Sequence, residues 1–112
     1  MEQFAVTSET IEGRCRVEAC GELDIATVED LEHAFEAALE SAPVELLVDL
    51  RAVTFIDSSG VALLLRMIDR CGERPPRFQI SPVIARLLEI IGLSERIPLA
   101  EPEPGPPPEP LA

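Results

Sequence analysis

Two adjacent serines, Ser58 and Ser59, are the residues of this chain whose types and spacing could do chemistry. They follow Asp57 and precede Gly60, between an apolar strand-like run and a leucine-rich helical run. This arrangement places two hydroxyls at a helix N-terminus, where unpaired backbone N–H groups favour negative charge. A serine at such a position caps the helix or accepts a phosphate. One residue suffices to cap a helix, so one hydroxyl is available for chemistry.

The same residues would suit a serine hydrolase, but the rest of the sequence does not support one. It contains no Gly-x-Ser-x-Gly motif, no Gly-Lys-Ser or Gly-Lys-Thr phosphate loop, and no lysine for a Ser–Lys dyad. The single histidine, His33, falls on the polar side of a helical segment. The cysteines Cys15, Cys20 and Cys71 fit no zinc or redox spacing, which indicates reduced, mostly buried thiols. We expect no catalytic residue, no metal site and no cofactor.

The composition predicts one acidic domain. The chain has 112 residues, is 46% hydrophobic and carries a formal net charge of −12, and all nine of its basic residues are arginines. An acidic surface repels nucleic acid and anionic membranes, so we expect neither as a partner. A protein with a basic patch is the natural complement. No signal peptide or membrane-spanning run is visible, which predicts a cytoplasmic protein.

Strand and helix patterns alternate along the chain. We expect strands near residues 4–6, 14–20, 44–50 with an extension to 55, and 78–80, and helices over residues 28–42, 61–71 and 82–91. A last edge strand at 96–99 is possible. Residues 9–13 read as a turn, and residues 21–24 close the second strand and lead into a loop. Residues 44–50 lack alternation, which is typical of a central parallel strand buried on both faces.

Capping patterns mark two of the helix starts. Thr27 followed by Asp30 resembles a capping box, and Ser81 before Pro82 is typical of an N-cap. The whole pattern predicts an α/β domain over residues 1–99, with a mixed four- to five-stranded sheet, parallel central strands and helices packed against it. The acidic, proline-rich residues 100–112 are expected to form a disordered tail. Ser58 would lie at the carboxyl edge of the sheet, where ligands and functional contacts are favoured.

Three motifs together resemble a known family. Gly21-Glu22-Leu23-Asp24, Asp57-Ser58-Ser59-Gly60 and Ile80-Ser81-Pro82, in this order and spacing, resemble the STAS domain, and more narrowly the bacterial anti-sigma factor antagonists. The resemblance covers roughly residues 4–99. Two departures are visible. Ala62 stands where many relatives have a second glycine, and the proline-rich tail stands where relatives often have a further helix.

The resemblance implies a partner switch. Unphosphorylated members bind an anti-sigma factor that is also an ATP-dependent serine kinase, and this releases a sigma factor. Phosphorylation of the motif serine, Ser58 by position, ends binding, and a PP2C-type phosphatase restores it. The implied partner surface comprises Gly21, Asp24, Thr27, Asp57, Ser58, Ser59 and Gly60. Two alternatives remain open: a STAS-type scaffold or sensor module, stressosome-like or transporter-associated, and a nucleotide-binding STAS domain.

Overall fold

The computed structural model describes residues 3–101. The expected tail lies, from residue 102 on, outside the described residues. The elements follow one another in the order β1 (Ala5–Ile11), β2 (Arg14–Leu23), α1 (Val28–Glu40), β3 (Glu45–Ile56), α2 (Ser58–Cys71), β4 (Arg77–Ile80), α3 (Pro82–Ile90) and a short 3₁₀ helix (Ser94–Arg96). This is the predicted α/β alternation, with longer strands than the sequence patterns indicate.

Within the described residues, the four strands form one mixed sheet in the order β1-β2-β3-β4. β1 and β2 form an antiparallel hairpin, and β2, β3 and β4 run parallel. The hairpin turn is shorter than expected and consists of Glu12 and Gly13 alone, which both have positive φ. Such a two-residue turn matches the twist of the flanking strands, and so β1 continues to Ile11.

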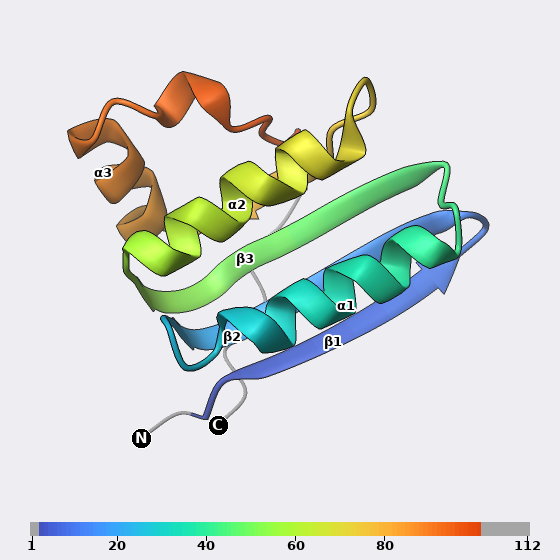
Figure 1. The fold of residues 1–112 in the computed structure, drawn as a ribbon, viewed down its shortest axis with the longest axis horizontal. Coiled ribbons are helices and arrows are strands. Elements are labelled where there is room, and N and C mark those ends of the chain that lie inside the picture. The colour runs from blue at the N-terminus through green and yellow to red at the C-terminus, as the bar shows by residue number, and fades with distance from the viewer. Residues whose placement is uncertain (1–2, 102–112) are drawn as a thin grey trace.

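All three helices contribute to one apolar core against one face of the sheet (Figure 1). Parallel strands joined by right-handed crossovers place the intervening helices on the same face. The fully buried side chains at the centre come from every layer: Val17, Leu31, Phe35, Val48, Leu63, Leu64, Phe78 and Ile84. As predicted, β2 alternates between buried residues such as Cys15 and exposed or half-buried ones such as Arg14.

The second face of β3 is only partly buried, which corrects the expectation of a strand buried on both faces. No helix of residues 3–101 covers that face. Asp49 is nevertheless only 2% exposed, because Arg16 and Arg51 both form ion pairs with its carboxylate. Burial on this side of the central strand therefore comes from arginine side chains, which local hydrophobicity cannot predict.

β3 is two residues longer than its partner β2. The β2–β3 register shifts between Glu18 and Cys20 and again between Gly21 and Glu22, and each shift adds one residue to β3. Bulges of this kind bend a strand and redirect the side chains that follow it. The second bulge lies close before Asp57, so it helps to set the direction in which the serine motif leaves the sheet.

The C-terminal part of the domain also differs from expectation. Ser81 holds the N-cap position of α3, but its buried hydroxyl makes no hydrogen bond within residues 3–101. The possible last strand is reduced to one bridge, between Leu99 and Phe78, because Pro98 has no N–H to continue a ladder. Ala100 still donates its N–H to the Phe78 carbonyl, so the ordered chain extends past residue 99. No helix within residues 3–101 has the length and apolar content needed to cross a bilayer.

Candidate functional site

Asp57, rather than a serine, caps helix α2. Its backbone is extended, with φ −113° and ψ −171°, and its carboxylate accepts the N–H groups of Ser59, at 2.9 Å, and of Gly60, at 3.2 Å. The serines are the first two residues of the helix itself. The expectation that one serine serves as the cap is therefore wrong: a carboxylate one residue earlier takes two of the orphan N–H groups, as aspartate commonly does.

The two serine hydroxyls have different environments. The hydroxyl of Ser59, which is half-buried, donates a hydrogen bond to the Asp57 carboxylate. Ser58 is exposed, and its hydroxyl makes no hydrogen bond to any residue in the range 3–101. Ser59 thus helps to hold the cap, while Ser58 presents a hydroxyl to solvent at the start of a 14-residue helix.

The Asp57 carboxylate is ionised at neutral pH. The hydrogen bond from the Ser59 hydroxyl, with the backbone N–H groups of Gly60, Ser59 and Ile25, holds the pKa of Asp57 below its ordinary value despite partial desolvation. A fixed negative charge therefore lies beside Ser58. This charge already neutralises part of the positive partial charge at the helix N-terminus. The helix end therefore attracts a phosphate less strongly than the sequence suggests.

The β2–α1 connection lies against this cap. Asp57 donates its backbone N–H to the Leu23 carbonyl at 3.3 Å, and Ile25 donates its backbone N–H to the Asp57 carboxylate. Two segments more than 30 residues apart in sequence therefore meet, as the shared sheet edge predicts. Asp24 and Thr27 accordingly belong to the same surface region as Ser58.

The expected capping box at Thr27 and Asp30 does not form. Thr27 already has helical backbone angles, with φ −118° and ψ −14°, and its side chain makes no cap hydrogen bond. Instead, its hydroxyl donates to the Glu22 carbonyl at 2.8 Å and accepts the Asp24 N–H at 2.9 Å. The Asp24 carboxylate accepts the Ala26 N–H at 2.9 Å. Thr27 therefore fastens the loop, and the loop fixes the direction of the Asp24 carboxylate.

Gly21 and Gly60 are buried and have packing roles. Gly21 lies within β2, not in the loop, with φ +97°, and a Cβ there would stand 3.0 Å from the Phe4 Cα. The φ of Gly60 is ordinary, but the absence of a Cβ lets the start of α2 lie close against Ile56 and Leu23. A Cβ at Gly60 would lie 2.6 Å from Cγ1 of Ile56 and 3.1 Å from Cγ of Leu23. Both glycines therefore allow the close packing beneath the predicted partner surface, and neither has a side chain that could contact a partner.

Gly60→Ala tests this close approach. An alanine inside a helix ordinarily stabilises it by about 1 kcal/mol relative to glycine. Here the added methyl must displace buried Ile56, and we expect a net loss of about 1–3 kcal/mol, as for other overpacked cores. Urea unfolding of wild type and variant measures the difference. A variant at least as stable as wild type would show that Ile56 and Leu23 can yield without cost.

Two exposed apolar side chains near the serine motif were not identified as site residues from the sequence. Ile25, in the loop that contacts Asp57, is 78% exposed, and Phe55, at the end of β3, is 45% exposed. Large apolar side chains beside a polar motif are typical of surfaces that bind proteins. The sequence feature that could have indicated Ile25 is its position as an isolated large apolar residue between Asp24 and Thr27, in a polar loop.

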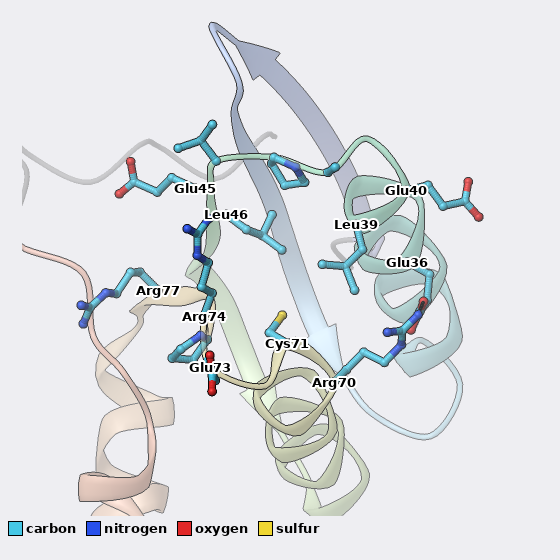
Figure 2. Close-up of a pocket in the computed structure, with 14 residues that line it drawn as sticks. Glu36, Leu39, Glu40, Glu45, Leu46, Arg70, Cys71, Glu73, Arg74 and Arg77 are labelled. Atoms are coloured by element: carbon cyan, nitrogen blue, oxygen red, sulfur yellow. Dashed lines mark hydrogen bonds and ion pairs between the residues drawn. The ribbon is translucent and has the colours of Figure 1, made fainter.

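A hollow of about 620 Å³ lies at the other end of the molecule, between the C-terminal ends of α1 and α2 and the start of β3 (Figure 2). Leu39, Leu46 and Cys71 line its interior, and charged residues such as the Arg70–Glu36 pair surround them. Burial raises the pKa of the Cys71 thiol, which therefore stays protonated and is a poor nucleophile. The hollow lies at the amino ends of the parallel strands, away from Ser58.

The fold and the acidic serine motif at the sheet edge define a class of protein. A family model described as "Mlab, STAS domain" matches residues 7–100. The chain is 30% identical over 82 residues to the anti-sigma-B factor antagonist of Staphylococcus aureus, and the match covers 70% of this chain and 76% of that protein. The chain belongs to the STAS-domain family and, within it, to the anti-sigma factor antagonists.

Solved structures agree with this assignment. An anti-sigma factor antagonist from Mycobacterium paratuberculosis superposes with a TM-score of 0.75 at 29% identity, over 87% of this chain and 85% of that one. The anti-sigma factor antagonist SpoIIAA in its unphosphorylated form superposes with a TM-score of 0.64 at 24% identity, over 87% and 89% of the two chains. The second similarity supports the fold.

Proposed function

We propose that this protein releases a sigma factor by binding an anti-sigma factor that is also a serine kinase, and that phosphorylation of Ser58 ends the binding. The observation that carries the proposal is the contrast between the two serines. The Ser58 hydroxyl is exposed and has no hydrogen-bond partner within residues 3–101, whereas the Ser59 hydroxyl is held by Asp57. A kinase needs an accessible hydroxyl, and Ser58 offers one.

The surface around Ser58 suits a protein partner. Asp57 directly precedes Ser58, the loop that carries Asp24 lies against the Asp57 cap, and Ile25 and Phe55 supply exposed apolar area. Such a surface complements a partner that combines a basic patch with an apolar pocket. The net charge of −12 would speed the approach of that partner through long-range attraction.

Local charge supplies the switch. A phosphate on Ser58 adds about −1.5 to −2 charge next to the ionised Asp57 carboxylate. In free protein, water screens the repulsion between the two groups. When a partner excludes water, the same repulsion grows and the phosphate loses its hydration. A difference of a few kcal/mol is enough to weaken affinity about a hundredfold. Release therefore needs no refolding of the domain.

The proposal assigns the chemistry to the partners. The kinase supplies ATP and transfers the phosphate, and a PP2C-type phosphatase removes it. This chain is the substrate of both reactions and catalyses neither. Because sigma factors act where transcription takes place, the proposal places the protein in the cytoplasm.

Phosphosite mapping tests the proposal. Full-length protein is incubated with its cognate anti-sigma kinase and ATP, and the site is located by mass spectrometry. We expect phosphate on Ser58 in wild type and none in Ser58→Ala. Ser59→Ala should still be phosphorylated, at a lower rate, because Asp57 loses the Ser59 hydroxyl and holds the helix start less firmly.

The Ser58→Ala and Ser59→Ala variants control for each other, since each removes one hydroxyl from the same helix turn. Phosphate found only on Ser59, or equal phosphorylation of Ser58→Ala and wild type, would refute the assignment of the switch. A chain that binds the anti-sigma factor but is never phosphorylated would instead behave as a constitutive scaffold.

A further inference from the structure

Strand β1 leaves one edge of the sheet open. β1 pairs with β2 on one side, and no strand within residues 3–101 pairs with its other side (Figure 1). Every residue of Ala5–Ile11 except Val6 is exposed. Edge strands normally carry protection against further pairing, such as charged side chains (above all lysine), proline, a bulge or short length. The seven residues of β1 include one charge, Glu9, but neither lysine nor proline, and their register with β2 is unbroken.

The other edge of the same sheet is protected. β4 has only four residues, and the segment that follows α3 returns to cover it. Phe78 donates its N–H to the Pro98 carbonyl at 2.8 Å, and Ala100 donates its N–H to the Phe78 carbonyl at 2.8 Å. The molecule thus closes the short edge and leaves the long one open.

The hairpin fixes which groups of β1 face outward. Glu12 and Gly13 form a two-residue turn with positive φ, so Ile11 and Arg14 are the hydrogen-bonded pair that closes the hairpin. Hydrogen-bonded and non-hydrogen-bonded pairs alternate along antiparallel strands. Residues 5, 7, 9 and 11 therefore point their N–H and C=O groups toward β2. Val6, Ser8 and Thr10 point theirs away from the sheet.

This spacing is self-complementary. An antiparallel copy of β1 centred on Ser8 places Ser8 opposite Ser8 and Val6 opposite Thr10, so that all the outward groups find partners. The same register places the only charge in the strand, Glu9, opposite Thr7, and the 58%-exposed Ile11 opposite Ala5. No like charges face each other across the pair, which is the arrangement that cross-strand pairing requires.

Helix α1 leaves room for the second copy. α1 packs over β1 and β2, and its Glu32 and Glu36 reach toward α2 to pair with Arg66 and Arg70. The flank turned away from α2, and hence toward the open edge, carries mostly small residues: Asp30, Ala34, Ala37 and Ser41. With strands about 4.8 Å apart, two such helices related by a twofold axis would lie about 10 Å apart. This is a normal packing distance for helices with small contact residues.

We infer that the β1 edge is a docking surface for a second copy of this chain, which forms a continuous eight-stranded sheet about a twofold axis at Ser8. The pairing surface lies on the far side of β2 from the Ser58 motif. Because the paired strands are antiparallel, the two Ser58 sites lie at opposite ends of the joined sheet. Each dimer therefore carries two switch sites that can bind partners independently.

Analytical ultracentrifugation of the full-length chain tests the interface. We expect wild type to change from monomer to dimer over roughly two decades of concentration in the micromolar range. Both chains are strongly acidic, so added salt should increase the dimer fraction between about 0.05 and 0.3 M ionic strength by screening their repulsion. An interface held by ion pairs would show the opposite salt dependence.

A charge exchange at the twofold axis tests the register. Ser8→Lys and Ser8→Glu each place two like charges opposite each other, and each variant alone should be monomeric. A one-to-one mixture of the two should form a heterodimer at least as stable as the wild-type dimer. Ser8→Ala is the neutral control and should associate as wild type does. Unchanged thermal midpoints establish that each variant is folded.

Three outcomes would overturn the inference. Wild type could remain monomeric across the concentration range, which would leave the edge to a strand from another protein. Ser8→Lys could dimerise as tightly as wild type, which would place the interface elsewhere. The mixture of Ser8→Lys and Ser8→Glu could fail to associate, which would exclude a twofold axis at Ser8.

Discussion

Ser58→Asp is expected to weaken binding to the anti-sigma factor about hundredfold while the fold persists. The fold should persist because an acidic residue in the first turn of a helix is favourable. Binding should weaken because the new carboxylate lies beside the ionised Asp57 carboxylate, and both would be desolvated in the complex. Isothermal titration of the purified anti-sigma factor with each variant measures the change.

Ser58→Asn separates charge from size in this experiment. Asparagine matches aspartate in shape and carries no charge, so Ser58→Asn should bind within several-fold of wild type. If the asparagine variant is as weak as the aspartate variant, bulk at residue 58 rather than charge controls the complex. A folded Ser58→Asp variant that binds as tightly as wild type would end the charge-switch mechanism.

The fold was predictable because its signals are local. Alternation in residues 14–20, the apolar run from residue 44 and the glycines that end α2 and α3 each mark an element without information from elsewhere. Gly72 and Gly92 both have the positive φ that such helix ends favour. The position of Ser58 at a strand–helix junction follows from the same signals. Neighbouring parallel strands then bring Asp24 to the same edge.

The details of the site were not predictable because several residues compete for the same hydrogen bonds. Asp57, Ser58 and Ser59 are all good caps, and the extended backbone of Asp57 decides which one caps α2. Thr27 is a good cap by type, but its helical backbone turns its hydroxyl back to the Glu22 carbonyl. Propensity identifies the candidates, and the backbone angles at Asp57 and Thr27 choose among them.

The arginine network on the uncovered sheet face is even less predictable from local sequence. Arg16 and Asp49 are 33 residues apart, and they meet only because β2 and β3 pair in one register. Gln79 of β4 joins the same group through Arg16, at 3.2 Å. Charged residues in a strand ordinarily indicate a solvated face. Here they bury a carboxylate and tie three strands together, which makes this face important for stability.

Asp49→Asn is therefore expected to be the most destabilising single polar substitution in the domain. The variant keeps the shape of the side chain but leaves Arg16 and Arg51 without their shared carboxylate. Removing one partner from a buried ion pair typically costs about 3–5 kcal/mol. For a domain of this size, the thermal midpoint should fall by more than about 10 °C. Glu45→Gln, which breaks the exposed Arg14–Glu45 pair, is the matched control and should cost under about 1 kcal/mol.

The pH dependence of stability identifies the cause of this loss. Burial alone would raise the pKa of Asp49, but hydrogen bonds from Arg51 and the charges of Arg16 and Arg51 outweigh it and hold that pKa below its ordinary value. A carboxyl with a lowered folded-state pKa contributes its full stability above its unfolded pKa, about 3.9, and loses it as pH falls through the folded value. Urea unfolding from neutral pH into acid should therefore show the gap between wild type and Asp49→Asn closing below about pH 4. A gap that stays constant into strong acid would mean that packing at residue 49, rather than its charge, stabilises the sheet.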